Sequence, residues 1–204
     1  MIAIIDYDAG NIKSVEKAVQ FLGEEAIITR DRDVIMDSSG VILPGVGSFG
    51  DAMGKINEYG LKNVIYDVVD SGKPFLGICL GLQLLFKTSE ETPGVTGLGI
   101  VDGQILRIPD ASGLKIPQIG WNSLDINPKA RLFKGLPEHP YVYFVHSYYL
   151  KADHEEDVAA STFYSTNIHA SIEHGNVFAC QFHPEKSSTV GLSILKNFAG
   201  IGEA

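Results

Sequence analysis

Two cysteines and six histidines are the side chains of this chain best suited to act as nucleophile and base near neutral pH. Cys79 lies in the pentapeptide GICLG, between Gly77 and Gly81. Small neighbours allow a sharp, strained turn that projects a side chain out of the backbone, as in a nucleophile elbow. A helix that begins after Cys79 would favour the thiolate, which is the nucleophilic form. A buried structural cysteine is the competing interpretation, because free cysteine is among the most buried residue types.

A thiol nucleophile needs a base and a group that orients the base. His183 follows the apolar run VFACQF, and Pro184 biases it toward an extended backbone. Residues two apart face the same way in an extended segment, so Glu185 is expected beside His183, where it accepts the ring proton. The tripeptide HPE therefore predicts a base and its orienting acid. Cys180 lies inside the same apolar run and is expected to be a core residue.

Acyl transfer also needs N–H donors for the oxyanion that develops on the reacting carbonyl. The segment LPGVGSFGD, residues 43–51, has glycines that allow backbone N–H groups to converge on a small anion. The N–H of Leu80, directly after the nucleophile, would add a donor. We therefore expect an oxyanion hole from Val46, Gly47 and Leu80, although a P-G-V-G segment alone is more typical of a simple turn.

Composition limits the classes of partner. The chain has 204 residues, 45% of them hydrophobic and 20% charged, which is typical of a compact globular protein. Its formal net charge of -9 gives no basic footprint for nucleic acid or for an anionic membrane, although a local basic patch remains compatible with it. A small molecule or another protein is the expected partner. The two cysteines form no disulfide framework, which favours the reducing cytoplasm.

No stretch of the sequence reaches the length of a membrane span, and residues 1–10 lack the features of a signal peptide. Residue 1 is therefore expected to be the start of the fold. The first two-thirds of the chain alternate short apolar runs with helical periods. Strands are expected at 1–6, 25–29, 40–45 and 73–79, and helical segments at 12–22, 49–72 with a break near Gly60, and 80–89.

From about residue 95 the pattern changes to short strands separated by turns, at 97–108, 120–126 and 141–150. A last strand at 176–185 precedes a closing helix at 188–200. These features predict one α/β domain, residues 1–204, with a doubly wound, mostly parallel sheet flanked by helices and an antiparallel or mixed extension. In such sheets ligands bind beyond the carboxyl ends of the strands, where Cys79 is expected.

Three motifs together, GICLGLQLLF, HPEKS and PGVGSF, resemble the triad class of glutamine amidotransferases, which has a flavodoxin-like amidotransferase fold. The segments MIAIIDYDAGNIKSVEKA, IGWN and YFVHSYY resemble, more narrowly, the glutaminase subunits of imidazole glycerol phosphate synthases. The likeness covers nearly the whole chain in the same order. It implies that Cys79 is the nucleophile, His183 the base and Glu185 the orienting acid.

The resemblance also implies binding roles. The residues that would hold the substrate glutamine are Gly45, Gly47, Gln83, Ser147 and Tyr148. The residues that would face a partner subunit are Asn11, Trp121, Asn122, Tyr143 and Lys186. One departure is Gln118, because the segment before G-W-N commonly reads P-H-M in this family and here reads PQI. The departure leaves the triad intact and affects expectations near the interface.

The implied activity is hydrolysis of glutamine to glutamate and ammonia through a cysteine thioester, which requires neither a metal nor an organic cofactor. The implied partner is a (β/α)₈ cyclase subunit, which uses the ammonia to make imidazole glycerol phosphate and aminoimidazole carboxamide ribonucleotide in histidine biosynthesis. One alternative is the glutaminase subunit of pyridoxal phosphate synthase, against which the N-terminal and YFVHSYY segments argue. Another is a flavodoxin-like binding module, but the loop DYDAGN lacks a Ser/Thr-rich phosphate cradle.

Overall fold

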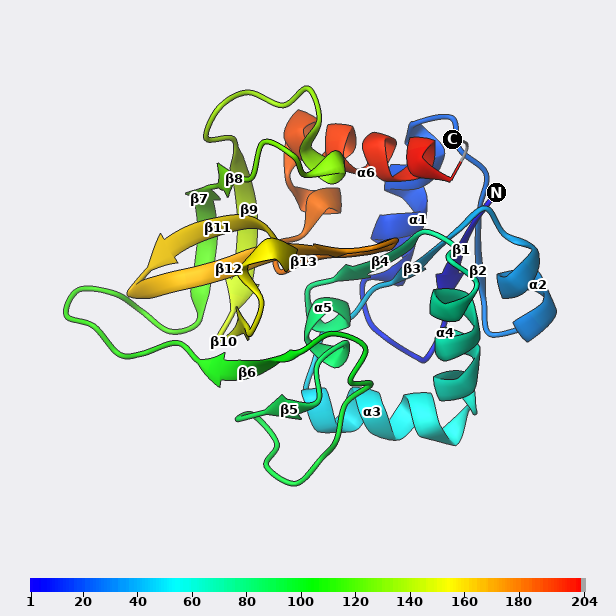
Figure 1. Ribbon diagram of the computed structural model, residues 1–204, viewed down its shortest axis with the longest axis horizontal. Helices are drawn as coiled ribbons and strands as arrows, with labels where there is room; N and C mark the ends of the chain where they lie inside the picture. Colours follow the sequence, from blue (N-terminus) through cyan, green and yellow to red (C-terminus); the bar gives the residue numbers. More distant parts are fainter. Residues whose placement is uncertain (203–204) are drawn as a thin grey trace.

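A mixed eight-stranded sheet forms the centre of the molecule, seen in a computed structural model that describes residues 1–202 (Figure 1). From edge to edge its strands are β2 (Ala26–Thr29), β1 (Ile2–Ile5), β3 (Gly40–Leu43), β4 (Phe75–Ile78), β13 (Val177–Cys180), β12 (Thr166–His174), β11 (Val158–Tyr164) and β8 (Asp125–Ile126). The first five are parallel, and the last three add antiparallel pairs. The predicted doubly wound sheet with a mixed extension is confirmed.

Helices cover both faces of the parallel part. One face carries α1 (Ile12–Phe21) and α6 (Ser188–Ile201), and the other carries α2 (Arg32–Asp37), α3 (Phe49–Glu58), α4 (Leu61–Asp70) and α5 (Leu80–Leu84) (Figure 1). Successive strand residues alternate between the two cores: Ala3 packs with α3 and α4, whereas Ile4 packs with α1 and α6. Burial on both faces explains why these strands read as continuous apolar runs.

Two helical predictions need correction. The helix expected at 80–89 ends at Leu84, because the chain tightens into turns there, with the Phe86 N–H bonded to the Gln83 carbonyl at 3.1 Å. Thr88–Ser89 instead form the short strand β5. Helix α2 was not predicted; Asp31 caps it by accepting the N–H groups of Asp33 and Val34. The expected break near Gly60 is present, since Gly60 has a φ of 67° between α3 and α4.

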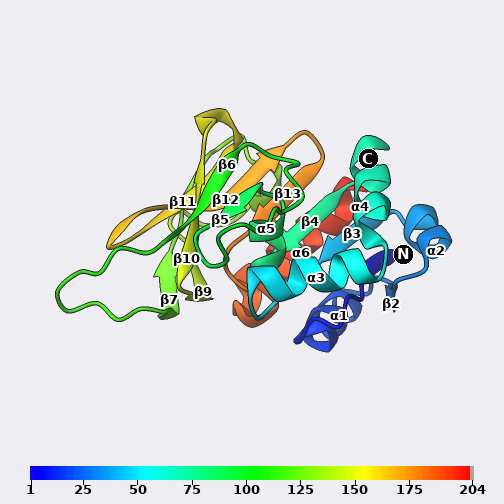
Figure 2. The same cartoon turned by 90° about the horizontal axis from the view of Figure 1, so that it is seen from below.

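The β-rich half extends to one side of the helix-flanked half (Figure 2). It contains a three-stranded sheet of β10 (Tyr148–Ala152), β6 (Gly103–Arg107) and β5, and a two-stranded sheet of β7 (Gln118–Ser123) and β9 (Tyr141–His146). Strands β11 and β12 lay outside the predicted elements. Short 3₁₀ turns are η1 (Arg131–Phe133), η2 (Glu155–Asp157) and η3 (Pro184–Lys186). Within residues 1–202 no helix is both long enough and apolar enough to cross a membrane.

Candidate active site

Cys79 forms a strained turn between β4 and α5. Its φ of 54° and ψ of -106° are unusual for any residue other than glycine. The flanking glycines are required by close approach: a Cβ on Gly77 would lie 2.7 Å from the Gly81 carbonyl oxygen, and a Cβ on Gly81 would collide with the Leu43 carbonyl oxygen. The spacing in GICLG therefore has a steric cause, and the turn has the geometry of a nucleophile elbow.

His183 and Glu185 form a buried pair beside this turn. His183 Nδ1 lies 2.7 Å from Glu185 Oε1, and the two side chains are 2% and 0% exposed. The expectation of an extended backbone through Glu185 is wrong, because β13 ends at Cys180 and Pro184 begins the 3₁₀ turn η3. This turn, rather than strand alternation, brings the carboxylate back to the imidazole. The predicted contact is present by a different local route.

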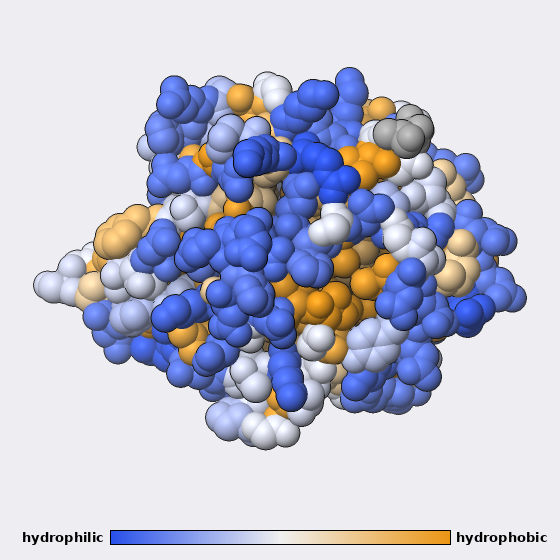
Figure 3. Space-filling model, viewed as in Figure 1, coloured by the Kyte–Doolittle hydropathy of each residue, from blue (hydrophilic) through white to orange (hydrophobic). Residues whose placement is uncertain are grey.

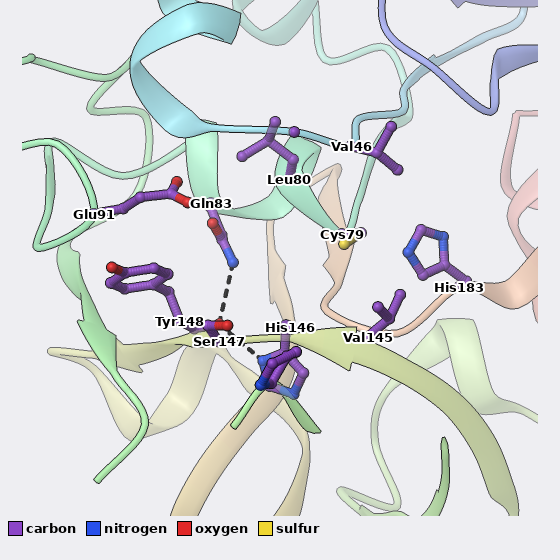
Figure 4. Close-up of a pocket in the computed structure, with 12 residues that line it drawn as sticks. Val46, Cys79, Leu80, Gln83, Glu91, Val145, His146, Ser147, Tyr148 and His183 are labelled. Atoms are coloured by element: carbon purple, nitrogen blue, oxygen red, sulfur yellow. Dashed lines mark hydrogen bonds between the residues drawn. The ribbon is translucent and has the colours of Figure 1, made fainter. Parts of the chain in front are cut away.

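The free nitrogen of His183 is placed for proton transfer at Cys79. The imidazole lies beside the Cys79 sulfur (Figure 4), and Nε2 has no hydrogen-bond partner among the described residues. Burial alone would lower the pKa of His183, but Cys79 and Glu185 outweigh it and raise that pKa to about 9. His183 is therefore protonated near neutral pH and has a proton available for a leaving group.

A cavity of about 270 Å³ opens in front of Cys79, just below the usual range for pockets that bind drug-sized ligands. Six of the predicted substrate and oxyanion residues line it, namely Val46, Gly47, Leu80, Gln83, Ser147 and Tyr148. Gly45, which was also predicted, is not a lining residue. Four lining residues were not predicted: Glu91, Pro117, Val145 and His146. The pocket suits a molecule of amino-acid size.

Glu91 and Gln83 place oxygen acceptors on one side of the cavity (Figure 4). Glu91 Oε2 accepts the N–H of Phe49 at 2.7 Å, which fixes the carboxylate at the start of α3. Gln83 Nε2 donates to the Tyr148 carbonyl at 3.2 Å and to Gln181 Oε1 at 3.1 Å. These acceptors suit the ammonium group of a free amino acid. Glu91 lies in the loop SEETPG, where nothing in the sequence distinguishes it from the adjacent Glu90 as a binding residue.

His146 and Gln118 support the wall that carries Ser147 and Tyr148. Burial is the main cause that lowers the pKa of His146, to about 4, so the ring is neutral. Its Nδ1 lies 2.8 Å from the Tyr148 carbonyl oxygen, its Nε2 lies 2.9 Å from Gln118 Oε1, and the neutral ring donates its one N–H to one of these two acceptors. Gln118 is 3% exposed. Gln118, which differs from the residue common at this position in the family, therefore supports the wall of the pocket. The sequence had indicated an effect near the interface with the partner subunit.

The loop over Cys79 occupies one of the predicted oxyanion donors. The Leu80 N–H is hydrogen-bonded to the Gly45 carbonyl at 3.3 Å. The neighbouring Pro44 carbonyl is held by the Tyr7 hydroxyl at 2.7 Å, and Gly47 has a φ of 103°. The Leu80 N–H becomes available to a substrate oxygen only when the Gly45 carbonyl turns away.

The residues expected to face a partner divide into two groups. Trp121 is 52% exposed on β7 and packs edge-on against Tyr143 at 6.1 Å. Asn122 bonds to the Phe163 carbonyl at 3.0 Å. Asn11 and Lys186 flank Glu185 instead: Asn11 Nδ2 lies 2.5 Å from Glu185 Oε1, and Lys186 is exposed.

Cys180 is fully buried in the core beneath α1 and α6, as predicted. Burial raises the pKa of the Cys180 thiol well above its usual value. It has neither the exposure nor the charge state of a nucleophile.

Known relatives identify the family of the chain. A family model described as glutamine amidotransferase class-I matches residues 3–200, so the chain belongs to that family. Imidazole glycerol phosphate synthase subunit HisH of Bacillus cereus (strain G9842) is 48% identical over 204 residues, covering 100% of this chain and 96% of the relative. The same subunit of Moorella thermoacetica is 49% identical over 197 residues, covering 97% and 93%. Within the family, the chain belongs to the HisH subunits.

Solved structures support the fold. One described as a glutamine amidotransferase superposes with a TM-score of 0.78 at 21% identity, covering 100% of both chains. The structure of PurLQS from Thermotoga maritima superposes with a TM-score of 0.76 at 20% identity, covering 98% of this chain and 97% of that one. The helix-flanked sheet is therefore shared by distantly related sequences.

Proposed function

We propose that this chain hydrolyses glutamine to glutamate and ammonia as the glutaminase subunit of imidazole glycerol phosphate synthase. The observation that carries the proposal is the buried His183–Glu185 pair beside the strained Cys79, in front of a cavity of amino-acid size. The family and the HisH relatives support the same activity. A flavodoxin-like binding module would have no need for this arrangement.

The chemistry follows from the geometry. The Cys79 thiolate attacks the side-chain amide carbon of glutamine, and the carbonyl oxygen becomes an oxyanion that backbone N–H groups of Val46, Gly47 and Leu80 stabilise. Protonated His183 gives its proton to the departing nitrogen, so ammonia leaves and a thioester remains. Water then attacks the thioester, His183 takes a proton from that water, and glutamate is released from the sulfur.

Glutamine is the substrate best matched to the pocket. Its side-chain amide reaches Cys79 while its α-ammonium group lies toward the acceptors of Glu91 and Gln83. Glutamate would place a second carboxylate at the Cys79 thiolate, which repels it. This difference favours substrate binding over product binding.

The ammonia is passed to a (β/α)₈ cyclase subunit, which makes imidazole glycerol phosphate and aminoimidazole carboxamide ribonucleotide in histidine biosynthesis, in the cytoplasm. Large exposed hydrophobic side chains suggest a docking face along β7 and β9, where Ile119, Trp121 and Tyr141 are 64%, 52% and 59% exposed. Large exposed apolar side chains gathered on one surface are typical of protein interfaces. The face in Figure 3 is largely hydrophilic, with a hydrophobic patch near its centre.

The test is release of glutamate from glutamine, measured for the chain alone and with the cyclase subunit and its ligand. We expect the complex to release glutamate and to consume the ammonia in cyclisation. No glutamate release by the complex would reject the glutaminase assignment. Stimulation by a pyridoxal phosphate synthase subunit, and not by the cyclase, would reject the partner.

A further inference from the structure

Gln181 is a fully buried polar residue between the nucleophile and the substrate pocket. It follows β13, its exposed fraction is 0%, and its backbone N–H is bonded to the Ala170 carbonyl at 2.8 Å. A buried amide without hydrogen-bond partners is strongly unfavourable, so the contacts of its two ends are informative. The reaction described above assigns it no role.

The two ends of the Gln181 amide contact two different parts of the site. Nε2 lies 3.8 Å from Cys79 Sγ and donates to it, while Oε1 accepts from Gln83 Nε2 at 3.1 Å. The direction of these bonds is fixed by the Tyr148 carbonyl, which only accepts and lies 3.2 Å from Gln83 Nε2. Gln83 must turn its NH₂ group to both partners, and Gln181 must therefore turn its oxygen to Gln83 and its nitrogen to the sulfur.

We propose that Gln181 is a positioning residue that couples the nucleophile to the substrate-binding side chain of Gln83. An N–H bond to sulfur strengthens when the thiol becomes a thiolate, because the acceptor is then charged. The bond from Gln181 thus favours the attacking form of Cys79 and limits the rotation of its side chain.

Gln181 also determines which atom of the Gln83 amide is left free to bind a ligand. With both N–H groups of Gln83 engaged by Gln181 and Tyr148, its Oε1 is left as an acceptor for the N–H donors of an amino acid. Among the described residues Oε1 of Gln83 has no protein donor. This inference rests on the proposed glutaminase function and adds the residue that aligns substrate binding with attack.

The test compares Gln181→Met, Gln181→Glu and the matched control Ser171→Ala. Methionine has a similar length but neither donates nor accepts as an amide does, whereas glutamate keeps an oxygen for Gln83 and loses the N–H to sulfur. Ser171 is equally buried and bonds to the Ala179 carbonyl of β13 at 2.7 Å, away from the pocket. The readouts are the rate of Cys79 alkylation by iodoacetamide in the full chain, and kcat and KM for glutamine in the cyclase complex.

We expect both Gln181 variants to alkylate about tenfold or more slowly, since a hydrogen bond to a charged group has a net strength of about 1.5–3 kcal/mol. KM should rise several-fold in Gln181→Met and stay near wild type in Gln181→Glu, because only methionine releases Gln83. A purely structural residue would not separate KM from kcat in this way. Alkylation at the wild-type rate in folded Gln181→Glu would overturn the bond to sulfur, and an unchanged KM in Gln181→Met would overturn the coupling to Gln83.

The alkylation arm does not depend on glutamine, so the two proposals fail separately. A wild-type complex that releases no glutamate rejects the glutaminase, whereas the alkylation rates still decide the bond between Gln181 and Cys79. Mass spectrometry of the alkylated chain identifies the modified cysteine. If Gln181→Met does not fold, the alkylation rate of Gln181→Glu still decides the bond to sulfur, and Gln181→Leu, which also lacks an acceptor for Gln83, replaces it in the KM comparison.

Discussion

Asn11 Nδ2 lies 2.5 Å from Glu185 Oε1, the same oxygen that contacts His183 Nδ1 at 2.7 Å. The other oxygen of Glu185 is buried and has no hydrogen-bond partner among the described residues. The loop that carries Asn11 is anchored by Arg30, which bonds to Asp6 at 2.8 Å. The loop after the first strand therefore selects which carboxylate oxygen faces the base.

Removing the Asn11 amide should slow glutaminase turnover. Because Asn11 has a φ of 69°, Asn11→Gly removes the side chain without backbone strain. We expect kcat to fall about tenfold, the scale of one hydrogen bond to a charged group. Asn11→Asp should fall further, since it places a second carboxylate against Glu185. A wild-type kcat in Asn11→Gly, measured in the cyclase complex, would exclude this positioning role.

Cys79→Ser should abolish glutamine-dependent activity and leave the cyclase able to use added ammonia. A serine hydroxyl is far less ionised than a thiol, so it is a poor nucleophile here. The matched control is Cys180→Ser, which should keep glutaminase activity while lowering thermal stability, because it places a hydroxyl in the core. A thiol-directed glutamine analogue should label Cys79; an adduct found on Cys180 would reverse the assignment.

Activity should have an alkaline limb near pH 9. The pKa of His183 is raised from 6.5 to about 9, so the proton needed by the leaving nitrogen is lost above that pH. Protonation of His183 also stabilises the folded protein, because the pKa of His183 is higher in the folded state. This contribution to the free energy of unfolding is fully present below about pH 6.5 and is lost as the pH rises through about 9. Unfolding of wild type and His183→Gln, measured from pH 6 to 10, should therefore converge; a constant difference would contradict the raised pKa.

Local signals explain what the sequence could predict. The requirement for Gly77 and Gly81 comes from one tight turn, and HPE places a base and an acid within three residues, so both appear as short motifs. The parallel strands were predictable because burial on both faces leaves continuous apolar runs. The end of α5 was not, since Leu85 and Phe86 are fully buried and continue the apolar pattern beyond the helix.

Contacts between distant segments explain what the sequence could not predict. Gln83 and Gln181 are 98 positions apart, and Asn11 and Glu185 are 174 apart. Their pairing depends on the order of β1, β4 and β13 in the sheet, which no periodicity specifies. Gln181 lies two residues before His183 in an apolar run, and a glutamine at a buried strand end was the only available signal.

The free subunit should be a poor glutaminase that its partner activates. The Leu80 N–H, an expected oxyanion donor, is bonded to the Gly45 carbonyl at 3.3 Å, so the loop must turn before it can stabilise a transition state. The glycine at position 47 makes such a change inexpensive, and partner contacts would select the open state. Loss of an oxyanion donor typically lowers turnover about 100- to 1000-fold, and we expect activation of that size. Equal glutaminase rates for the free subunit and the ligand-loaded complex would refute gating.

Lys186 follows the triad acid and is exposed, so it is suited to pair with a carboxylate of the partner. Lys186→Ala should weaken the activation, whereas Lys151→Ala, at an exposed lysine outside the pocket lining, should leave it unchanged; an equal response in both variants would remove Lys186 from the route.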